Sequence, residues 1–175
     1  INIPSVGGII IKIERISNPM TVIVTGATSF IGRAVVKALL EEGCRVVAVS
    51  RPASAGAGKL QELFEDLKKQ AGAEKKVFGS LELCFCELGE IEKLEKIYKK
   101  EELQAKAWLH LGWDGAGSDK RKDVKLQEKN IGYALQSLHT AAALGCKRFL
   151  FSGSQAEYGI CNEWMKEEQE CHPVS

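Results

Sequence analysis

Residues 25–32 have the composition and order of a phosphate-binding turn. They read Thr-Gly-Ala-Thr-Ser-Phe-Ile-Gly and stand between an apolar run and a helix-like segment. Gly26 permits a tight turn out of a strand, and Gly32 permits close packing of the following helix on a sheet. A helix N-terminus also directs free backbone N–H groups and the positive end of its dipole toward a phosphate. We therefore predict that dinucleotide phosphates contact this turn, at Gly26, Thr28, Ser29, Phe30, Ile31 and Gly32.

Ser29 occupies the position at which the usual dinucleotide pattern has its second glycine. A small hydroxyl-bearing residue there still admits a phosphate and could hydrogen-bond to it. The alternative interpretation of residues 25–32 is a tight strand-to-helix turn that binds no ligand. The strand-turn-helix context favours the binding interpretation.

Arg51 lies where a dinucleotide site recognises the adenosine ribose, roughly 20 residues beyond the glycines. An NAD site would place Asp or Glu there to accept a hydrogen bond from the ribose 2′-hydroxyl. A guanidinium cannot accept that bond, but it pairs well with a 2′-phosphate. Arg51 therefore favours NADP over NAD as the cofactor. The alternative is a solvated loop residue, or one stacked on the adenine.

Alternating strand-like and helix-like segments position these residues. Short apolar runs, several rich in β-branched residues, predict strands at 21–25, 45–50, 81–86, 107–111 and 148–152. The predicted helices between them carry Ile31, Val35 and Leu39 on one face, then Leu60, Leu63, Phe64 and Leu67, then Ile91, Leu94, Ile97 and Tyr98, and finally Leu126, Ile131, Leu135 and Leu138. This alternation predicts an α/β fold: a doubly wound parallel sheet of five strands with helices on both faces.

Size and charge exclude several classes of protein. The 175 residues, 45% hydrophobic and 27% charged, suit one globular domain with a packed core. The formal net charge of +1 lacks the excess of basic residues typical of an electrostatically driven nucleic-acid binder. Apolar runs are far shorter than the roughly 20 residues of a membrane-spanning helix. We expect neither nucleic acid nor a membrane as a partner.

The six cysteines are spread along the chain, and no Cys-x-x-Cys pair occurs. Cys84 and Cys86 are two residues apart in an apolar run, which places both on one face of a strand. We expect them to act as small core hydrophobes, with metal ligation as the alternative, and we predict no metal site. We expect no signal peptide before the domain, and a reducing cytoplasm as its location.

Residues 1–19 stand apart from the domain predicted at 20–175. The sequence begins with Ile1, and Met20 comes immediately before the first strand-like run. We expect residues 1–19 to be upstream translation or vector-derived sequence. The alternative is an additional N-terminal strand that contains Ile9, Ile10 and Ile11.

Several of these segments resemble the extended short-chain dehydrogenase/reductase family, the NAD(P)-dependent nucleotide-sugar epimerases and dehydratases. Residues 25–32 resemble its Thr-Gly-x-x-Gly-x-x-Gly turn, residues 87–88 its Asp-Leu pair beside the adenine, and residues 110–112 the His-Leu-Ala segment that ends its fourth strand. The resemblance implies a Rossmann domain. It assigns further residues to cofactor binding, namely Glu87, Leu88, His110, Leu111, Gly112 and Asn130.

Residues 151–159 resemble the family's Ser-Ser-x-x-x-Tyr-Gly segment after the fifth strand. On that alignment Ser154 takes the place of the catalytic Ser or Thr, which hydrogen-bonds the reacting hydroxyl or carbonyl. The resemblance also places Trp113, Gln155 and Tyr158 near the substrate. Residues 113–115 and 153–159 together resemble a bacterial branch that acts on nucleotide-linked sugars.

The family's proton donor is a Tyr with a Lys four residues on, whose cation lowers the phenol pKa. None of Tyr98, Tyr133 and Tyr158 has a Lys at that spacing. Residues 172–175 resemble the segment that directly precedes the family's Tyr-x-x-x-Lys motif. We therefore expect a C-terminally truncated, incomplete Rossmann domain that is inactive by itself.

Together these patterns predict the N-terminal, cofactor-binding part of an NAD(P)-dependent epimerase, dehydratase or reductase that acts on a nucleotide sugar. The alternative is a non-enzymatic NAD(P) sensor on the same fold, in which cofactor binding controls a protein partner. For the full-length enzyme the resemblance makes a homodimer possible.

Overall fold

The computed structural model describes residues 19–52, 54–100, 103–116, 120–162 and 164–174. The N-terminal extension was predicted at residues 1–19, and residues 1–18 of it lie outside the described residues. Five parallel strands form one sheet in the order β3-β2-β1-β4-β5. Their bounds are Thr21–Thr25 (β1), Arg45–Ser50 (β2), Ser80–Phe85 (β3), Ala105–His110 (β4) and Arg148–Phe151 (β5). The predicted five-stranded parallel sheet is confirmed.

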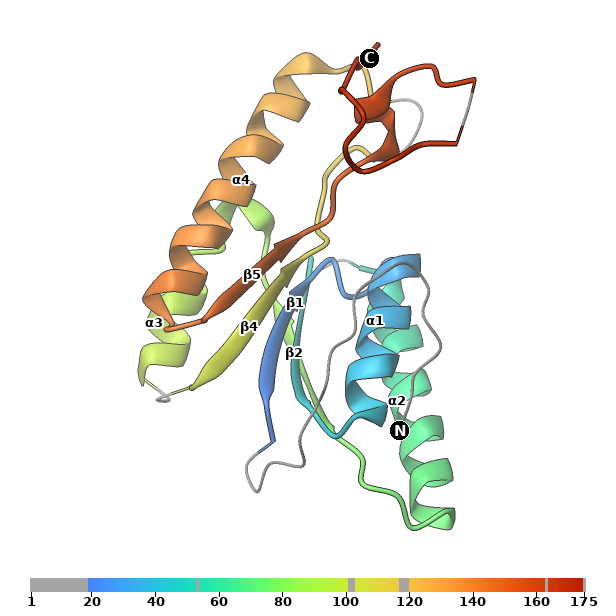
Figure 1. Cartoon of the computed structure of the whole chain (residues 1–175). Helices are drawn as coiled ribbons and strands as arrows, with labels where there is room; N and C mark the ends of the chain where they lie inside the picture. Colours follow the sequence, from blue (N-terminus) through green and yellow to red (C-terminus); the bar gives the residue numbers. More distant parts are fainter. Residues whose placement is uncertain (1–18, 53, 101–102, 117–119, 163, 175) are drawn as a thin grey trace.

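Helices cover both faces of this sheet. Helices α1 and α2 lie on one face, and α3 and α4 lie on the other (Figure 1). Their bounds are Phe30–Glu41 (α1), Gly56–Ala73 (α2), Lys93–Lys100 (α3) and Val124–Ala143 (α4). Two short 3₁₀ turns, Leu88–Glu90 (η1) and Gln155–Tyr158 (η2), follow β3 and β5. None of the described helices has the length and apolar character needed to cross a membrane.

Successive residues of the central strands contribute to two separate cores. On β1, Val22 and Val24 belong to the cluster beneath α1 and α2, whereas Ile23 belongs to the cluster beneath α3 and α4. Strand β2 alternates in the same way, with Val46 in the first cluster and Val47 in the second. This alternation follows from the two-residue period of a strand, and burial on both faces explains the almost continuous apolar runs.

Helix α1 buries a different face from the predicted one. The sequence pattern predicts a face of Ile31, Val35 and Leu39. Of these, Leu39 is partly buried against the core, but the fully buried residues are Gly32, Val36 and Leu40. Ile31 is 61% exposed. The physical reason is the turn before the helix: Gly32 must face the sheet because the backbone approaches closely there. Its position fixes the helix rotation and moves the buried face by one residue.

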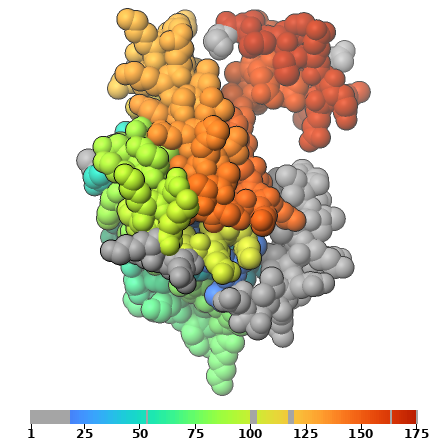
Figure 2. Space-filling model, turned by 90° about the vertical axis from the view of Figure 1, so that its left-hand side faces the viewer, coloured from blue at the N-terminus to red at the C-terminus, as the bar shows by residue number. Residues whose placement is uncertain are grey.

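Helix α4 also presents its larger apolar residues away from the sheet. Ile131, Leu135 and Leu138 are exposed, and Leu126 is half-buried. The buried residues of this helix are instead small or polar, namely Asn130, Ser137, Thr140 and Ala141. Small side chains let the helix approach the sheet closely. Figure 2 shows α4 running beside α3 on this side of the molecule.

The other predicted elements differ from the structure mainly at their ends. Strand β4 begins two residues before the predicted 107–111 segment, and β3 ends one residue before Cys86. Cys84 and Cys86 nevertheless contact the same core, as predicted from their spacing. Burial raises the pKa of the Cys86 thiol to about 11, so the group is a neutral thiol. The described part of the chain contains no cluster of three metal-ligating side chains.

We predict that Leu40→Ala destabilises the protein far more than Ile31→Ala on the same helix. Leu40 is 1% exposed, and removing such a side chain costs about 2–5 kcal/mol of unfolding free energy. Ile31 is largely exposed, so its loss should change the unfolding free energy by no more than about 0.5 kcal/mol. Urea unfolding of both variants measures the difference. Equal destabilisation would contradict the observed helix rotation.

Candidate dinucleotide-binding site

The candidate site lies at the carboxyl edge of the sheet. Strands β1, β2, β4 and β5 all end at the edge toward which α1 directs its N-terminus (Figure 1). Open α/β sheets bind their ligands in the crevice outside this edge. The predicted site residues follow the ends of different strands, and the parallel topology brings them to the same edge.

Two glycines make the turn after β1 possible. Gly26 has a φ of +67°, and a Cβ there would lie 2.7 Å from backbone atoms of Leu111 and Gly112. A Cβ at Gly32 would lie 2.1 Å from the Gly26 carbonyl oxygen. Both positions therefore require glycine, the first for its conformation and contacts and the second for its contacts alone. The same contacts hold the β1 turn against the segment that follows β4.

The N-terminus of α1 leaves two backbone donors for a ligand. The first four N–H groups of a helix have no intrahelical acceptor. In α1 the Ser29 hydroxyl accepts from Gly32 N at 3.0 Å, and the Gly26 carbonyl accepts from Ser29 N at 3.0 Å. The N–H groups of Phe30 and Ile31 are the remaining pair, on a largely exposed first turn. The Ser29 hydroxyl proton can still be donated to a phosphate.

Arg33 and Ser54 join this turn, although the sequence analysis did not select either. The Arg33 guanidinium donates to the Thr28 carbonyl at 2.6 Å, which places a cation beside the N-terminus of α1. The hydroxyls of Thr28 and Ser54 are 2.9 Å apart. A Cβ at Gly56 would lie 2.8 Å from the Thr28 carbonyl oxygen, so the start of α2 packs closely on the turn. The glycine at position 56 was the signal in the sequence for this approach.

A buried hydrogen bond joins the end of β1 to the end of β4. The Thr25 hydroxyl lies 3.0 Å from Nδ1 of His110. The same hydroxyl accepts from Gly112 N at 3.4 Å. One proton lies between the Thr25 hydroxyl and Nδ1, and the tautomer of the neutral imidazole decides which of the two groups donates it. The bond fixes the ends of the two strands on either side of the Gly26 turn.

His110 is shielded from solvent and cannot act as an exposed base. Its exposure is 1%, and its ring stacks with those of Phe149 and Phe151 at centroid distances of 6.0 and 5.8 Å. Burial lowers the pKa of His110 to about 4, so the ring is neutral at physiological pH. Nε2 is buried and has no hydrogen-bond partner among the described residues. The structure therefore makes His110 an anchor of the strand ends.

The Glu87-Leu88 segment lies against the same strand end. Leu88 side-chain atoms would lie 3.0 Å from a Cβ at Gly112. Glu87 is exposed and precedes the η1 turn. The resemblance predicted both residues beside the cofactor, and the structure places Leu88 next to the Gly26–Gly112 contact.

Asn130 organises the loop after β4. It is 1% exposed, its Oδ1 accepts from Asp114 N at 2.8 Å, and its Nδ2 donates to the Asp114 carbonyl at 2.8 Å. Trp113 donates from Nε1 to Oε1 of Gln127 at 2.7 Å and meets the Phe151 ring edge-on. The buried Asn130 side chain therefore holds the backbone of the loop after β4 in place. The Trp113 side chain in that loop stays partly exposed.

Arg51 directly follows β2, and its side chain reaches toward the loop after β4. Its guanidinium is 4.0 Å from Asp114, and both side chains are exposed. Sequence reasoning missed Asp114 as a partner of Arg51, because 63 positions separate 51 from 114 and only the sheet order brings them together.

Ser154, Gln155 and Tyr158 lie beyond the end of β5. Ser152 N donates to the His110 carbonyl at 3.2 Å, which links this segment to the β4 end. The Ser154 hydroxyl accepts from Ala156 N at 3.2 Å and stays exposed. Partial burial and then the Glu157 carboxylate raise the pKa of Tyr158, the opposite of what an activated phenol requires. Within the described part of the chain, no side-chain hydrogen bond or ion pair joins these three residues to the glycine turn.

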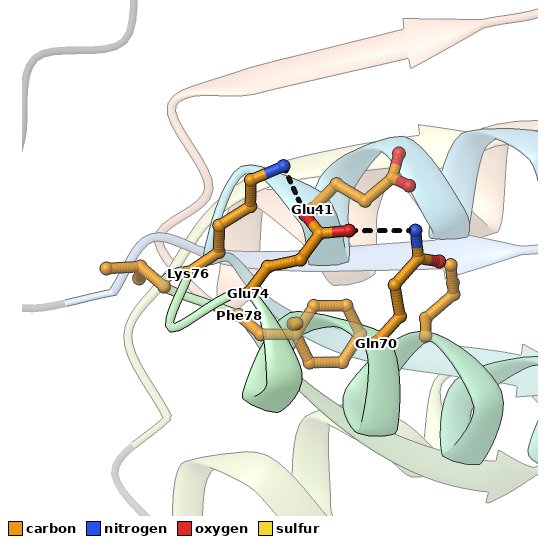
Figure 3. Close-up of a pocket in the computed structure, with 8 residues that line it drawn as sticks. Glu41, Gln70, Glu74, Lys76 and Phe78 are labelled. Atoms are coloured by element: carbon orange, nitrogen blue, oxygen red, sulfur yellow. Dashed lines mark hydrogen bonds and ion pairs between the residues drawn. The ribbon is translucent and has the colours of Figure 1, made fainter.

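A cavity of about 190 Å³ lies at the opposite edge of the sheet, between the C-terminal ends of α1 and α2 (Figure 3). Glu74 accepts from Gln70 and pairs with Lys76 there, so these polar groups already have partners. The volume of this cavity is below the roughly 300–1,000 Å³ of small-molecule sites. It is also far from the strand ends that carry the predicted residues, and we do not assign a ligand to it.

A parallel sheet of this order, with a glycine turn between β1 and α1, defines a Rossmann-type dinucleotide-binding fold. The sequence model of the NAD dependent epimerase/dehydratase family matches residues 22–175 of the chain. The chain belongs to this family. The resemblance stated from the sequence is thereby confirmed.

Curated relatives of known name match most of the chain. UDP-glucose 4-epimerase 2 of Arabidopsis thaliana is 31% identical over 148 residues, which are 84% of this chain and 39% of that protein. The dTDP-6-deoxy-L-talose 4-dehydrogenase (NAD(+)) of Aggregatibacter actinomycetemcomitans is 30% identical over 155 residues, 88% of this chain and 48% of that protein. The chain spans less than half the length of these relatives.

Solved structures share the fold. A Thermotoga maritima UDP-glucose 4-epimerase with UDP-glucose has a TM-score of 0.64 at 24% identity, covering 89% of this chain and 45% of that one. A Brucella ovis UDP-glucose 4-epimerase in complex with NAD has a TM-score of 0.68 at 17% identity, covering 89% and 42%. At these identities the likeness shows the fold alone.

We predict that Gly32→Ala destabilises the protein by at least about 2 kcal/mol, because its methyl group would meet the Gly26 carbonyl oxygen. Gly58→Ala, inside α2 with open space around it, is the matched control. It should stabilise the protein by about 0.5–1 kcal/mol through helix propensity. Thermal unfolding of both variants tests this. A Gly32→Ala protein as stable as the parent would contradict the close approach.

We predict that His110 makes stability depend on pH. Its pKa is about 4 when folded and about 6.5 when unfolded, so the unfolded state binds more protons between these values. Its contribution is fully present above a pH of about 6.5 and is lost as the pH falls toward about 4, about 3 kcal/mol in total.

The variant His110→Asn should flatten this pH dependence, whereas the exposed His139→Asn on α4 should leave it unchanged. Urea unfolding at several pH values between these limits gives the slopes. The same slope in His110→Asn as in the parent would show that other groups cause the dependence.

Proposed function

We propose that this chain forms the cofactor-binding half of an NAD(P)-dependent enzyme. The enzyme would be an epimerase, a dehydratase or a reductase that acts on a nucleotide-linked sugar. One observation carries the proposal. At the carboxyl end of β1, Gly26 and Gly32 leave no room for a Cβ, and the Phe30 and Ile31 amides belong to the largely exposed first turn of the helix. That arrangement suits a pyrophosphate.

The residues present fit a dinucleotide along the whole edge. The pyrophosphate would accept hydrogen bonds from the Phe30 and Ile31 amides and from the Ser29 hydroxyl. The Arg33 cation beside Thr28 would offset its charge. The adenosine would lie toward Arg51 and the η1 segment, and the nicotinamide toward the ends of β4 and β5. The bound nicotinamide would supply hydride transfer.

The choice between NAD and NADP depends on Arg51. No carboxylate stands at the strand end where an NAD site accepts the 2′-hydroxyl, and a guanidinium suits a 2′-phosphate. This supports NADP as the preferred cofactor. The NAD in the name of the Aggregatibacter relative and in the Brucella structure supports NAD as one that the fold accepts.

Ser154 would hold the reacting oxygen of the sugar. It is exposed just beyond β5, at the edge where the nicotinamide would end. Trp113, Gln155 and Tyr158 would lie near the substrate from the two neighbouring loops. The names of the relatives, UDP-glucose epimerases and a dTDP-sugar dehydrogenase, support a nucleotide sugar as the substrate class and an enzyme rather than a sensor.

Proton transfer needs a group that these 175 residues do not present. No tyrosine of the sequence has a lysine four residues on, and the pKa of Tyr158 is raised. We therefore propose that the chain alone binds cofactor without turning over substrate. A cytoplasmic location, and a homodimer of the whole protein, stay predictions.

The test is a fluorescence titration of the chain with NADH and NADPH, alongside an assay with UDP-glucose. We expect saturable binding of dinucleotide, displaced by ADP-ribose, with no detectable epimerisation or oxidation. Ser154→Ala should bind the nucleotides like the parent, because the hydroxyl would contact substrate only. Absence of nucleotide binding would overturn the proposed function, and turnover by the chain would overturn the assignment of proton transfer outside it.

A further inference from the structure

The Arg51–Asp114 ion pair joins the ends of two strands that are not neighbours. Arg51 follows β2 and Asp114 lies in the loop after β4, and β1 runs between those strands in the sheet. The pair therefore bridges the sheet edge on the two sides of the β1 end. This is the edge at which the proposed cofactor would lie.

The backbone is held at both ends of the ion pair. The Arg51 carbonyl accepts from Ser54 N at 3.0 Å. The backbone N–H and carbonyl of Asp114 are both bonded to the buried Asn130 side chain at 2.8 Å. Only the two side chains need to move to form or break the pair. A carboxylate is thus held in reach of the one cation that the sequence assigns to the cofactor's 2′-phosphate.

We propose that Asp114 is a specificity-determining residue, which competes with the cofactor's 2′-phosphate for Arg51 and so limits the preference for NADP over NAD. This inference rests on the proposed function. A 2′-phosphate that pairs with Arg51 competes with Asp114 for the guanidinium, and it lies near the Asp114 carboxylate, which repels it. A 2′-hydroxyl carries no charge, so NAD neither forms a charge pair with Arg51 nor is repelled by Asp114.

The size of the effect follows from the exposure of the two side chains. They are 65% and 45% exposed at 4.0 Å, so the pair is screened and its disruption is inexpensive. Exposed ion pairs of this kind change an equilibrium by about two- to fivefold. Asp114 would therefore modulate cofactor choice without reversing it, and its effect would weaken as salt is raised.

Adenosine 2′,5′-bisphosphate and 5′-AMP are the probes, because they differ only in the 2′-phosphate and need no nicotinamide contacts. Calorimetric titration of the parent gives the ratio of the two affinities. Asp114→Asn should raise this ratio about two- to fivefold, through tighter binding of the bisphosphate alone. Asp66→Asn on α2, an exposed residue whose substitution makes the same change in net charge, should leave the ratio unchanged.

A double-mutant cycle with Arg51→Gln separates direct competition from a general charge effect. In the Arg51→Gln protein, Asp114→Asn should no longer alter the ratio. An Asp114→Asn protein with the parental ratio, or a gain that persists without Arg51, would overturn this inference while nucleotide binding stands. Failure of the parent to bind either probe would overturn the proposed function and this inference with it.

Discussion

The close contact of three backbone segments at the end of β1 is the constraint on which the rest of the site depends. Gly26 touches the Leu111–Gly112 backbone, and Gly32 lies against the Gly26 carbonyl. These contacts leave the β1 turn, the start of α1 and the end of β4 no freedom to separate. A side chain at either glycine would push apart the elements that present the phosphate donors. The rotation of α1, and with it the choice of Val36 and Leu40 for the core, follows from the same approach.

The Thr25–His110 bond adds polar specificity to this contact. Burying the neutral imidazole of His110 costs less free energy than burying its charged form, whose desolvation is far more expensive. The bond selects a single alignment of the two strand ends, which hydrophobic contact between β-branched residues would not do by itself. It also explains why a histidine at the carboxyl edge of the sheet, a usual place for catalytic groups, is an anchor: the ring is buried, and a buried nitrogen cannot reach a substrate.

Much of the fold could be predicted from sequence, because burial on both faces of a parallel sheet produces apolar strands separated by amphipathic helices. The β1 and β2 bounds and the glycine turn match the structure for this reason. The pairing of Arg51 with Asp114 could not be predicted, since it depends on sheet order. Arg33 was missed because its cation reaches the turn through the Thr28 carbonyl, a contact that residue spacing does not encode.

Helix α4 shows why hydrophobic periodicity identifies a helix more reliably than it identifies the packed face. Ile131, Leu135 and Leu138 have helical spacing, yet the residues that face the sheet include Asn130 and Thr140. Asn130 is buried because both ends of its amide bond the Asp114 backbone, and Thr140 because its hydroxyl donates to the Gln136 carbonyl at 2.9 Å. Polar residues whose bonds are satisfied can occupy a packed face at little cost, and close approach to the sheet favours their small size. The rotation of this helix is therefore set by the loop it must hold and not by its largest apolar side chains.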